Sequence, residues 1–203
     1  MMISINPNEK TERENYKILT GSVIPRPIAF ITTLSEDGVV NAAPFSYFNI
    51  VSSNPPLLSV SVQRSKGEMK DTSRNIMRQK EFVIHIVDED IVHNMNKTAA
   101  SLAPNESELE LTTLTQIESS HVSVPGVKEA KIRMECVLDR TLQLGEKSTP
   151  SCDLIIGQVV QFHIKNNVYQ NGKIDPWELS AVSRLAGHNY VNLGEIYEIV
   201  RPK

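Results

Sequence analysis

Residues 39–75 read VVNAAPFSYFNIVSSNPPLLSVSVQRSKGEMKDTSRN, and this stretch decides the fold. It begins as a β-strand, breaks into a loop of small residues, and returns at 57–63 as a strand with polar residues at alternate positions. Its basic segment leads into a helix that we expect to run through Gln79, with Asp71 or Thr72 as its N-cap. The composition of residues 52–56 predicts a loop between the two strands.

The chain just before this stretch predicts a β-hairpin over residues 28–43. Two apolar runs, 28–34 and 39–42, flank the sequence Ser-Glu-Asp-Gly. An Asp-Gly pair in this position is a strong hairpin signal, because glycine accepts the positive φ of a tight turn. Pro44 lacks the N–H that a ladder needs, so we expect it to end the pairing.

The remaining chain alternates between strands and irregular segments. Further strands are expected at 81–87, 131–144 and 152–164, with a loop over 146–151 between the last two. A short helix or a turn is expected near residues 8–18 and a helix over 88–100, and residues 101–128 are expected to cross the surface. Strands joined by turns, without regular β–α–β alternation, favour a mainly β fold, a closed or nearly closed antiparallel barrel with helical insertions. Residues 1–203 are expected to form one domain.

Composition excludes several classes of partner. The formal net charge is -3 over 203 residues, so nucleic acid and anionic membrane surfaces are not expected partners. The sequence has no apolar run of membrane-spanning length and no signal-peptide pattern at its start, which predicts a cytoplasmic protein. Cys136 and Cys152 match no zinc spacing and are expected to be reduced and buried.

Common catalytic and nucleotide-binding motifs are missing. The five histidines are scattered without paired ligands, so no metal site is expected. The sequence has no G-x-S-x-G elbow, no P-loop and no G-x-G-x-x-G fingerprint. A nicotinamide nucleotide would therefore bind without a Rossmann unit. His85, within an apolar strand, is expected in the core, and Trp177 is expected to be a packing anchor.

Two segments suggest a ligand site, and each also has a structural explanation. Lys70, the Thr72 hydroxyl and the free N–H groups of a helix start would together bind an anion, with Arg64 nearby. An ordinary capped helix with solvated lysines explains the same residues. Residues 41–46, with small side chains between Asn41 and Ser46, would let a flat ligand approach the backbone, or would simply form a strand-end turn.

The order of these segments resembles a known family. The likeness is carried by RPIAFITT (26–33), DG (37–38), NAAPFSYFN (41–49), SNPP (53–56), SVSV (59–62), KDTSRN (70–75), RLAGHNY (184–190) and GEIYEI (194–199). These segments are similar to the flavin reductase family with the FMN-binding split barrel. The likeness extends over roughly residues 25–202. Ala186 stands where many relatives have glycine, and a positive φ at that position would be strained.

The resemblance implies a six-stranded antiparallel Greek-key barrel and a homodimer with FMN at or near its interface. At matching positions it implies that the flavin ring lies along Asn41, Ala42, Pro44 and Ser46. The ribityl chain and phosphate would run beside Ser61, Val62 and Arg64, and Lys70, Asp71 and Thr72 would hold the phosphate end. Arg184 and Tyr190 would lie near the flavin, from this subunit or its partner.

The resulting hypothesis is an FMN-binding oxidoreductase, an NAD(P)H-dependent flavin reductase. The flavin performs the chemistry, and no catalytic side chain is expected. Backbone N–H groups of residues 42–45 would bind the polar edge of the ring. Reduced flavin would pass to a partner monooxygenase or to another acceptor. Two alternatives remain: an FMN-binding electron carrier like flavoredoxin, and a split barrel that has lost flavin.

Overall fold

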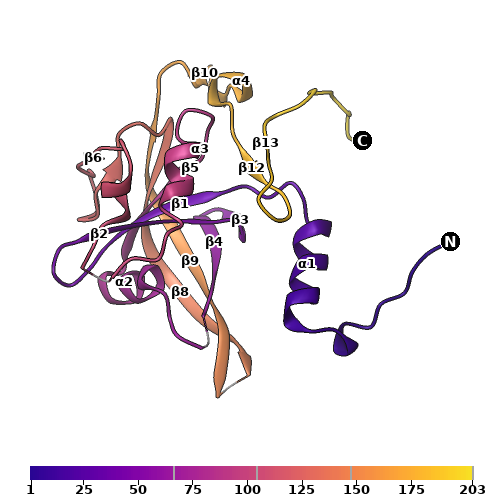
Figure 1. Cartoon of the computed structure of the whole chain (residues 1–203). Helices are drawn as coiled ribbons and strands as arrows, with labels where there is room; N and C mark the ends of the chain where they lie inside the picture. The colour runs from indigo at the N-terminus through magenta and orange to yellow at the C-terminus, as the bar shows by residue number, and fades with distance from the viewer. Residues whose placement is uncertain (66, 104, 147, 203) are drawn as a thin grey trace.

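Seven antiparallel strands form the main sheet in the described part of the chain, in the order β2-β1-β5-β8-β9-β4-β3 (Figure 1). The computed structural model describes residues 1–65, 67–103, 105–146 and 148–202. The strands are β1 (Ala29–Leu34), β2 (Val40–Phe45), β3 (Phe48–Ser53), β4 (Pro56–Gln63), β5 (Glu81–Ile86), β8 (Ile132–Glu146) and β9 (Thr149–Ile164). The sheet has one strand more than the resemblance implied, because β3 is a strand of its own.

Shorter elements decorate the sheet. Three two-stranded ribbons pair β6 (Gln116–Ile117) with β7 (Gly126–Val127), β10 (Tyr169–Gln170) with β11 (Lys173–Ile174), and β12 (Ser183–Arg184) with β13 (Tyr190–Val191). The helices are η1 (Pro7–Glu9), α1 (Glu12–Ser22), α2 (Asp71–Gln79), α3 (Val92–Lys97), η2 (Glu108–Leu111) and α4 (Pro176–Leu179). Within the described residues, no helix is long and apolar enough to cross a membrane.

The hairpin prediction is confirmed, but the role given to Pro44 was wrong. β1 and β2 pair from Ala29↔Phe45 to Leu34↔Val40, and Gly38 has φ +80° in the turn. Pro44 stays inside β2, opposite Phe30. The Val40 carbonyl and the Ala42 N–H bond to side chains on the side away from β1. Main-chain groups alternate in direction along a strand, so Pro44 also faces away from β1, and its missing N–H removes no ladder bond.

The barrel interior follows the alternation predicted for β4. Leu58, Val60 and Val62 are buried, while the serines between them are partly exposed. These side chains join a core cluster that also contains Phe82 and Ile155. Both cysteines are free and buried, as expected.

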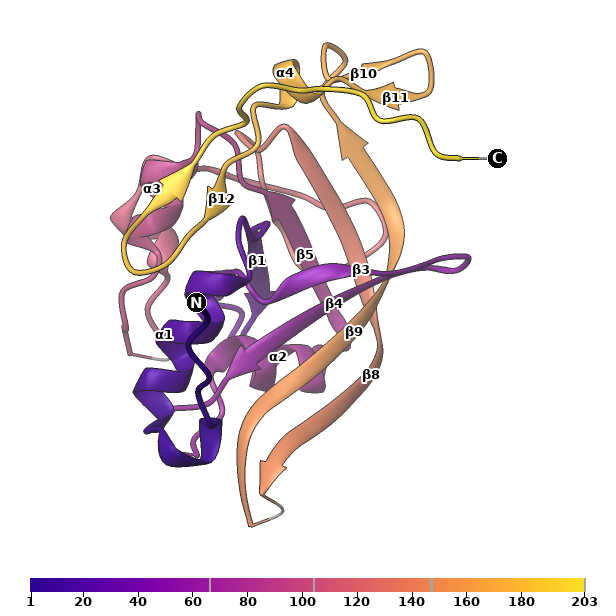
Figure 2. The ribbon, with the colours of Figure 1, turned by 90° about the vertical axis from the view of Figure 1, so that its right-hand side faces the viewer.

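Several predicted boundaries were wrong. The loop expected over 146–151 is mostly strand, because β8 and β9 continue as a ribbon that pairs through Glu146↔Thr149 (Figure 2); Lys147 lies outside the described residues. The loop expected at 52–56 shrinks because β3 runs to Ser53 and β4 starts at Pro56. Trp177 is 59% exposed, so it is not a packing anchor.

The helices also differ from expectation. α1 starts at Glu12 because Thr11 and Glu14 form a capping box. α2 starts at Asp71 with Lys70 as its N-cap, so neither Asp71 nor Thr72 caps it. α3 is shorter than predicted, since the Asp88 carboxylate accepts the N–H groups of residues 90 and 91 and holds a turn before it. Residues 101–128 do not stay on the surface, because part of this segment is buried: Glu108, Leu109, Leu114, Val122, Val124 and Val127.

Candidate functional site

Two adjoining cavities lie beside the end of β2. The first, of about 430 Å³, lies between β2, the start of α2 and residues 98–102; we call it the α2 cavity. The second, of about 480 Å³, lies between α1, residues 44–47, α3 and the β12–β13 ribbon; we call it the α1 cavity. Both are lined by Pro44, Phe45 and Ala99, so they adjoin at these residues, and we call the pair of cavities the depression beside β2.

Most of the residues named from the sequence line this depression. Asn41, Pro44, Lys70, Asp71 and Thr72 line the α2 cavity. Pro44, Ser46, Arg184 and Tyr190 line the α1 cavity. Segments that are far apart in the sequence therefore meet at one place. Ala42, Ser61, Val62 and Arg64 do not line either cavity.

The start of α2 brings positive groups to the α2 cavity, whose lining also contains the carboxylates of Glu68, Asp71 and Glu108. Among the residues that the structure describes, no side chain caps the first N–H groups of this nine-residue helix. The Lys70 ammonium lies 5.8 Å from the centre of the Phe45 ring at the same end of the cavity. Asp71 pairs with Arg74, one turn along the helix, and this pairing offsets its negative charge. A helix N-terminus with an adjacent lysine is a suitable site for an anion.

A buried polar network lies beneath the α2 cavity. Glu108 accepts hydrogen bonds from the Asn41 amide at 2.7 Å and from the Ala42 N–H at 2.9 Å. The Asn41 carbonyl oxygen accepts from the Thr72 hydroxyl at 2.9 Å. The same oxygen accepts from Thr33 at 3.3 Å. The side chains of Asn41 and Thr72 thus already bond to the protein, and they fix the start of α2 against β2.

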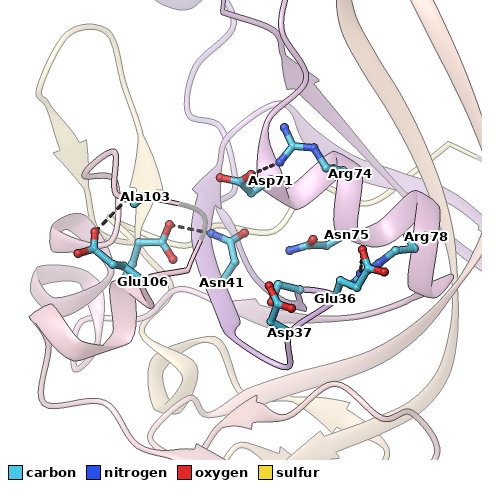
Figure 3. Close-up of a pocket in the computed structure, with 11 residues that line it drawn as sticks. Glu36, Asp37, Asn41, Asp71, Arg74, Asn75, Arg78, Ala103 and Glu106 are labelled. Atoms are coloured by element: carbon cyan, nitrogen blue, oxygen red, sulfur yellow. Dashed lines mark hydrogen bonds and ion pairs between the residues drawn. The ribbon is translucent and has the colours of Figure 1, made fainter.

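A smaller cavity of about 170 Å³ adjoins the α2 cavity and shares Asn41, Asp71, Arg74 and Glu108 with it (Figure 3). Its wall carries Glu36 and Asp37 from the β1–β2 turn, and Arg74 and Arg78 from α2. Arg78 pairs with Glu36 at 3.3 Å, and Arg74 pairs with Asp71. Both arginines are therefore paired with carboxylates. The described residues contain no group of three or more possible metal ligands.

Arg64 and Val62 are placed away from the cavities for clear physical reasons. Arg64 forms a fork with the fully buried Asp153 carboxylate, with its shortest N–O distance 2.7 Å. This hydrogen bonding raises the pKa of Arg64. Val62 points into the barrel core, as the alternation along β4 requires. Ser61 lies on the opposite face, where its hydroxyl accepts from Gln63 at 3.1 Å.

The backbone donors expected at residues 42–45 are also used elsewhere. Ala42 donates to Glu108, and Pro44 has no N–H. Ala43 and Phe45 face the partner strand β1, opposite Ile31 and Ala29. Hydrogen-bond donors for a ligand beside β2 must therefore come from side chains or from residues beyond the strand.

The α1 cavity is built around Arg26, which sequence reasoning did not select. Its guanidinium, in a residue that is 6% exposed, donates to the carbonyls of Thr20 at 2.7 Å, Val23 at 2.5 Å and Leu185 at 2.9 Å. Its Nε lies 3.5 Å from the Ser46 hydroxyl oxygen. Arg26 is the first residue of the RPIAFITT motif, and its place in that motif could have marked it as a candidate site residue. No sequence signal pointed to Glu108, because residues 101–128 were expected to lie on the surface.

The β12–β13 ribbon closes the outer side of this cavity. The Arg184 guanidinium lies 4.4 Å from the centre of the Tyr190 ring and donates to the Gly187 carbonyl at 2.6 Å. The Tyr190 hydroxyl donates to Asn96 on α3 at 2.8 Å. The positive φ in this loop falls on Gly187, at +62°, and not on Ala186. The strain considered for Ala186 therefore does not arise.

Comparisons with known proteins agree with this architecture. The family model "Flavin reductase like domain" matches residues 20–178. Nitrilotriacetate monooxygenase component B from Bacillus cereus is 60% identical, with a TM-score of 0.97 over 98% of this chain and 99% of that one. The Bacillus subtilis protein YwrF is 50% identical over 204 residues, which is 99% of this chain and 100% of that protein.

A more distant structure supports the fold alone. A putative flavin reductase with a split barrel domain from Shewanella frigidimarina has a TM-score of 0.82 at 22% identity, over 96% of each chain. The predicted mainly β split barrel is thereby confirmed.

Proposed function

The chain belongs to the flavin reductase-like family, and on that basis we propose that it is an FMN-binding oxidoreductase that takes electrons from NADH or NADPH. In the proposed reaction, a hydride passes from NAD(P)H to FMN, which gives NAD(P)⁺ and negatively charged reduced FMN. Bound FMN supplies the two-electron chemistry, and the protein binds and orients it.

The observation that carries the proposal is the uncapped start of α2 beside Lys70, at one end of the α2 cavity, which adjoins the α1 cavity. These residues fit the phosphate of FMN, because free N–H groups and an ammonium satisfy its negative charge. From there a ligand can extend past Pro44 and Phe45 into the α1 cavity. The short side chains of Ala43 and Pro44 let a flat ring lie close to the backbone of β2.

The wall of the α1 cavity suits the ring end of such a ligand. It combines aromatic and apolar side chains with the Ser46 hydroxyl and the guanidinium groups of Arg26 and Arg184. This wall is largely polar, and its placed hydrogen-bonding groups beside aromatic rings could orient a flat ligand with a polar edge. Arg64 is paired with Asp153, and the Ala42 N–H donates to Glu108, so neither group is proposed to bind FMN.

Absorption spectroscopy tests the proposal directly. The purified protein is titrated with FMN, and NADH or NADPH is then added without oxygen. We expect a bound-flavin spectrum followed by bleaching with at least one nicotinamide. Failure of FMN to bind would overturn the proposal. Bound FMN that is reduced by a protein donor but by neither nicotinamide would identify an electron carrier instead.

A lysine variant tests where the phosphate lies. Lys70→Ala is expected to weaken FMN binding at least tenfold, since a charge-assisted bond is worth about 1.5–3 kcal/mol. Riboflavin has no phosphate, so its affinity should change little. Lys173→Ala, which removes the same charge from the exposed ribbon strand β11, serves as the matched control. Equal losses for FMN and riboflavin would place the phosphate elsewhere.

We further propose that reduced flavin leaves this protein for a partner oxygenase or another acceptor. The support is the high similarity to a Bacillus cereus protein that is named as a monooxygenase component. Without oxygen, a catalytic amount of a protein that releases reduced flavin should bleach a large excess of free FMN when NADH is added. If bleaching stops after one FMN per site, the flavin is retained and the release step is wrong.

A second copy of the chain is the partner that we propose for the exposed apolar side. α1 and both termini project from the same side of the barrel (Figure 1). Large apolar side chains are exposed on α1 and in the C-terminal segment, including Leu19 at 60% and Tyr197 at 76%. Exposed large apolar side chains of this kind, when they gather in a patch, commonly mark an interface. Analytical ultracentrifugation should show a dimer at micromolar concentration, and a monomer would refute this proposal.

A further inference from the structure

We propose that Arg26 is a positioning residue that joins the walls of the α1 cavity and makes that cavity selective for the negatively charged, reduced form of the flavin. This inference rests on the proposed function, and it goes further by assigning a role to a residue outside the sequence-predicted site.

Arg26 connects three separate parts of the chain. Through the Thr20 and Val23 carbonyls it holds the C-terminal end of α1, and through the Leu185 carbonyl it holds the β12–β13 loop. Its main chain pairs with Arg184 in both directions, at 3.0 and 2.8 Å. α1, residues 44–47 and the β12–β13 ribbon all line the α1 cavity, so the shape of the cavity depends on Arg26.

The charge of Arg26 has no acidic partner among the described residues. Its acceptors are carbonyls and one hydroxyl, and no ion pair includes it within the described ranges. The described lining of the α1 cavity contains Arg26, Arg184 and His188 and lacks any carboxylate, although the whole chain has a net charge of -3. A buried positive charge without a counter-ion favours an anionic occupant.

The same geometry sets which groups remain available to a ligand. A guanidinium has five N–H donors, and the contacts to three carbonyls and to Ser46 use four of them. One N–H on Nη2 remains. Because Ser46 accepts from Arg26, the proton of its own hydroxyl is left to donate into the cavity. Both remaining groups are donors, which suits an electron-rich ring edge.

These donors replace the backbone donors expected from the sequence. The N–H groups of residues 42–45 are bonded to Glu108, directed toward β1 or missing at Pro44. Stabilisation of negative charge on a ligand in the α1 cavity therefore falls to Arg26 and the residues that it orients.

The test compares affinities for oxidised and reduced FMN, obtained from titration and from the midpoint potential of bound and free flavin. Arg26→Met is expected to lower the preference for the reduced form at least tenfold, which corresponds to about 30 mV for a two-electron couple. Arg26→Lys keeps the positive charge but loses the planar guanidinium that bonds to three carbonyls. It should weaken binding of both forms at least fivefold while keeping their ratio within threefold.

A control variant and two alternative variants keep the test decisive. Arg140→Met removes an exposed arginine from the β8–β9 ribbon and should change neither affinity. If Arg26→Met does not fold, Arg26→Lys and Ser46→Ala carry the test, and Ser46→Ala should lower the ratio at least twofold. Wild-type protein that binds no FMN would refute the proposed function and this inference together. FMN binding with an unchanged ratio in Arg26→Met, or unchanged affinities in Arg26→Lys, would refute this inference alone.

Discussion

Lowering the pH from 7.5 to 5.0 is expected to destabilise the protein by about 2 kcal/mol through His85 alone. The His85 ring is fully buried on β5, where Nδ1 lies 2.8 Å from the Phe30 carbonyl and Nε2 lies 2.8 Å from the Val127 N–H. A carbonyl only accepts and an N–H only donates, so the ring is neutral, with its proton on Nδ1.

The size and sign of this effect follow from the pKa. Burial lowers the pKa of His85 to about 4, from about 6.5 in the unfolded chain. The unfolded state therefore binds the proton more readily, and stability that is complete above pH 6.5 is lost as the pH falls toward 4. With these two pKa values, the linkage relation gives about 2 kcal/mol at pH 5.0 and almost none at pH 7.5.

Urea denaturation followed by far-UV circular dichroism measures the effect. His85→Gln cannot take up a proton, so its free energy of unfolding should depend less on pH than that of the wild type, by about 2 kcal/mol over this interval. The variant will be less stable at both pH values, and only the difference between the two pH values tests the reasoning. His121→Gln, at an exposed position, should retain the wild-type dependence. Equal pH dependence in wild type and His85→Gln would refute the account.

Three substitutions give further tests. Gly157→Ala would place a Cβ in steric clash with the Phe82 ring in the barrel core, and we expect the free energy of unfolding in urea denaturation to fall by about 1–3 kcal/mol. Arg64→Ala should lower the denaturation midpoint, because it leaves a buried carboxylate without a partner, yet FMN affinity should stay within threefold of wild type. Glu108→Ala should destabilise the protein by about 1–3 kcal/mol, because the Ala42 N–H loses its acceptor, while the exposed Glu106→Ala should have little effect on stability.

Local signals were enough to predict most of the sheet. The Asp37-Gly38 turn fixed the β1–β2 hairpin, and the two-residue alternation from Leu58 to Val62 identified the buried face of β4. Both signals act over a few residues, within the range at which backbone geometry and burial leave a pattern in the sequence. Pro44 misled the prediction because its effect depends on which side of β2 faces another strand, and that depends on tertiary structure.

Long-range pairs could not be predicted from the same patterns. Asp153 meets Arg64 across 89 positions, and Glu108 meets Asn41 across 67. A charged residue in a polar segment looks the same whether it is solvated or folded onto a distant strand. The motif as a whole indicated where the site lies, because its segments line one depression. The motif could not show which of its side chains are free to bind a ligand, because partners such as Asp153 and Glu108 lie outside it.

This difference changes how the ring end of the site is expected to work. If backbone N–H groups of β2 held the ligand, side-chain substitutions there would have small effects, and selectivity for charge would be a fixed property of the barrel. In the structure Glu108 takes the Ala42 donor, and Arg26 supplies the charge instead. Arg26, supported by carbonyls from α1 and the β12–β13 loop, then joins the walls of the cavity and contributes a buried positive charge beside Arg184. Substitutions at position 26 should therefore tune the site more strongly than any substitution along β2.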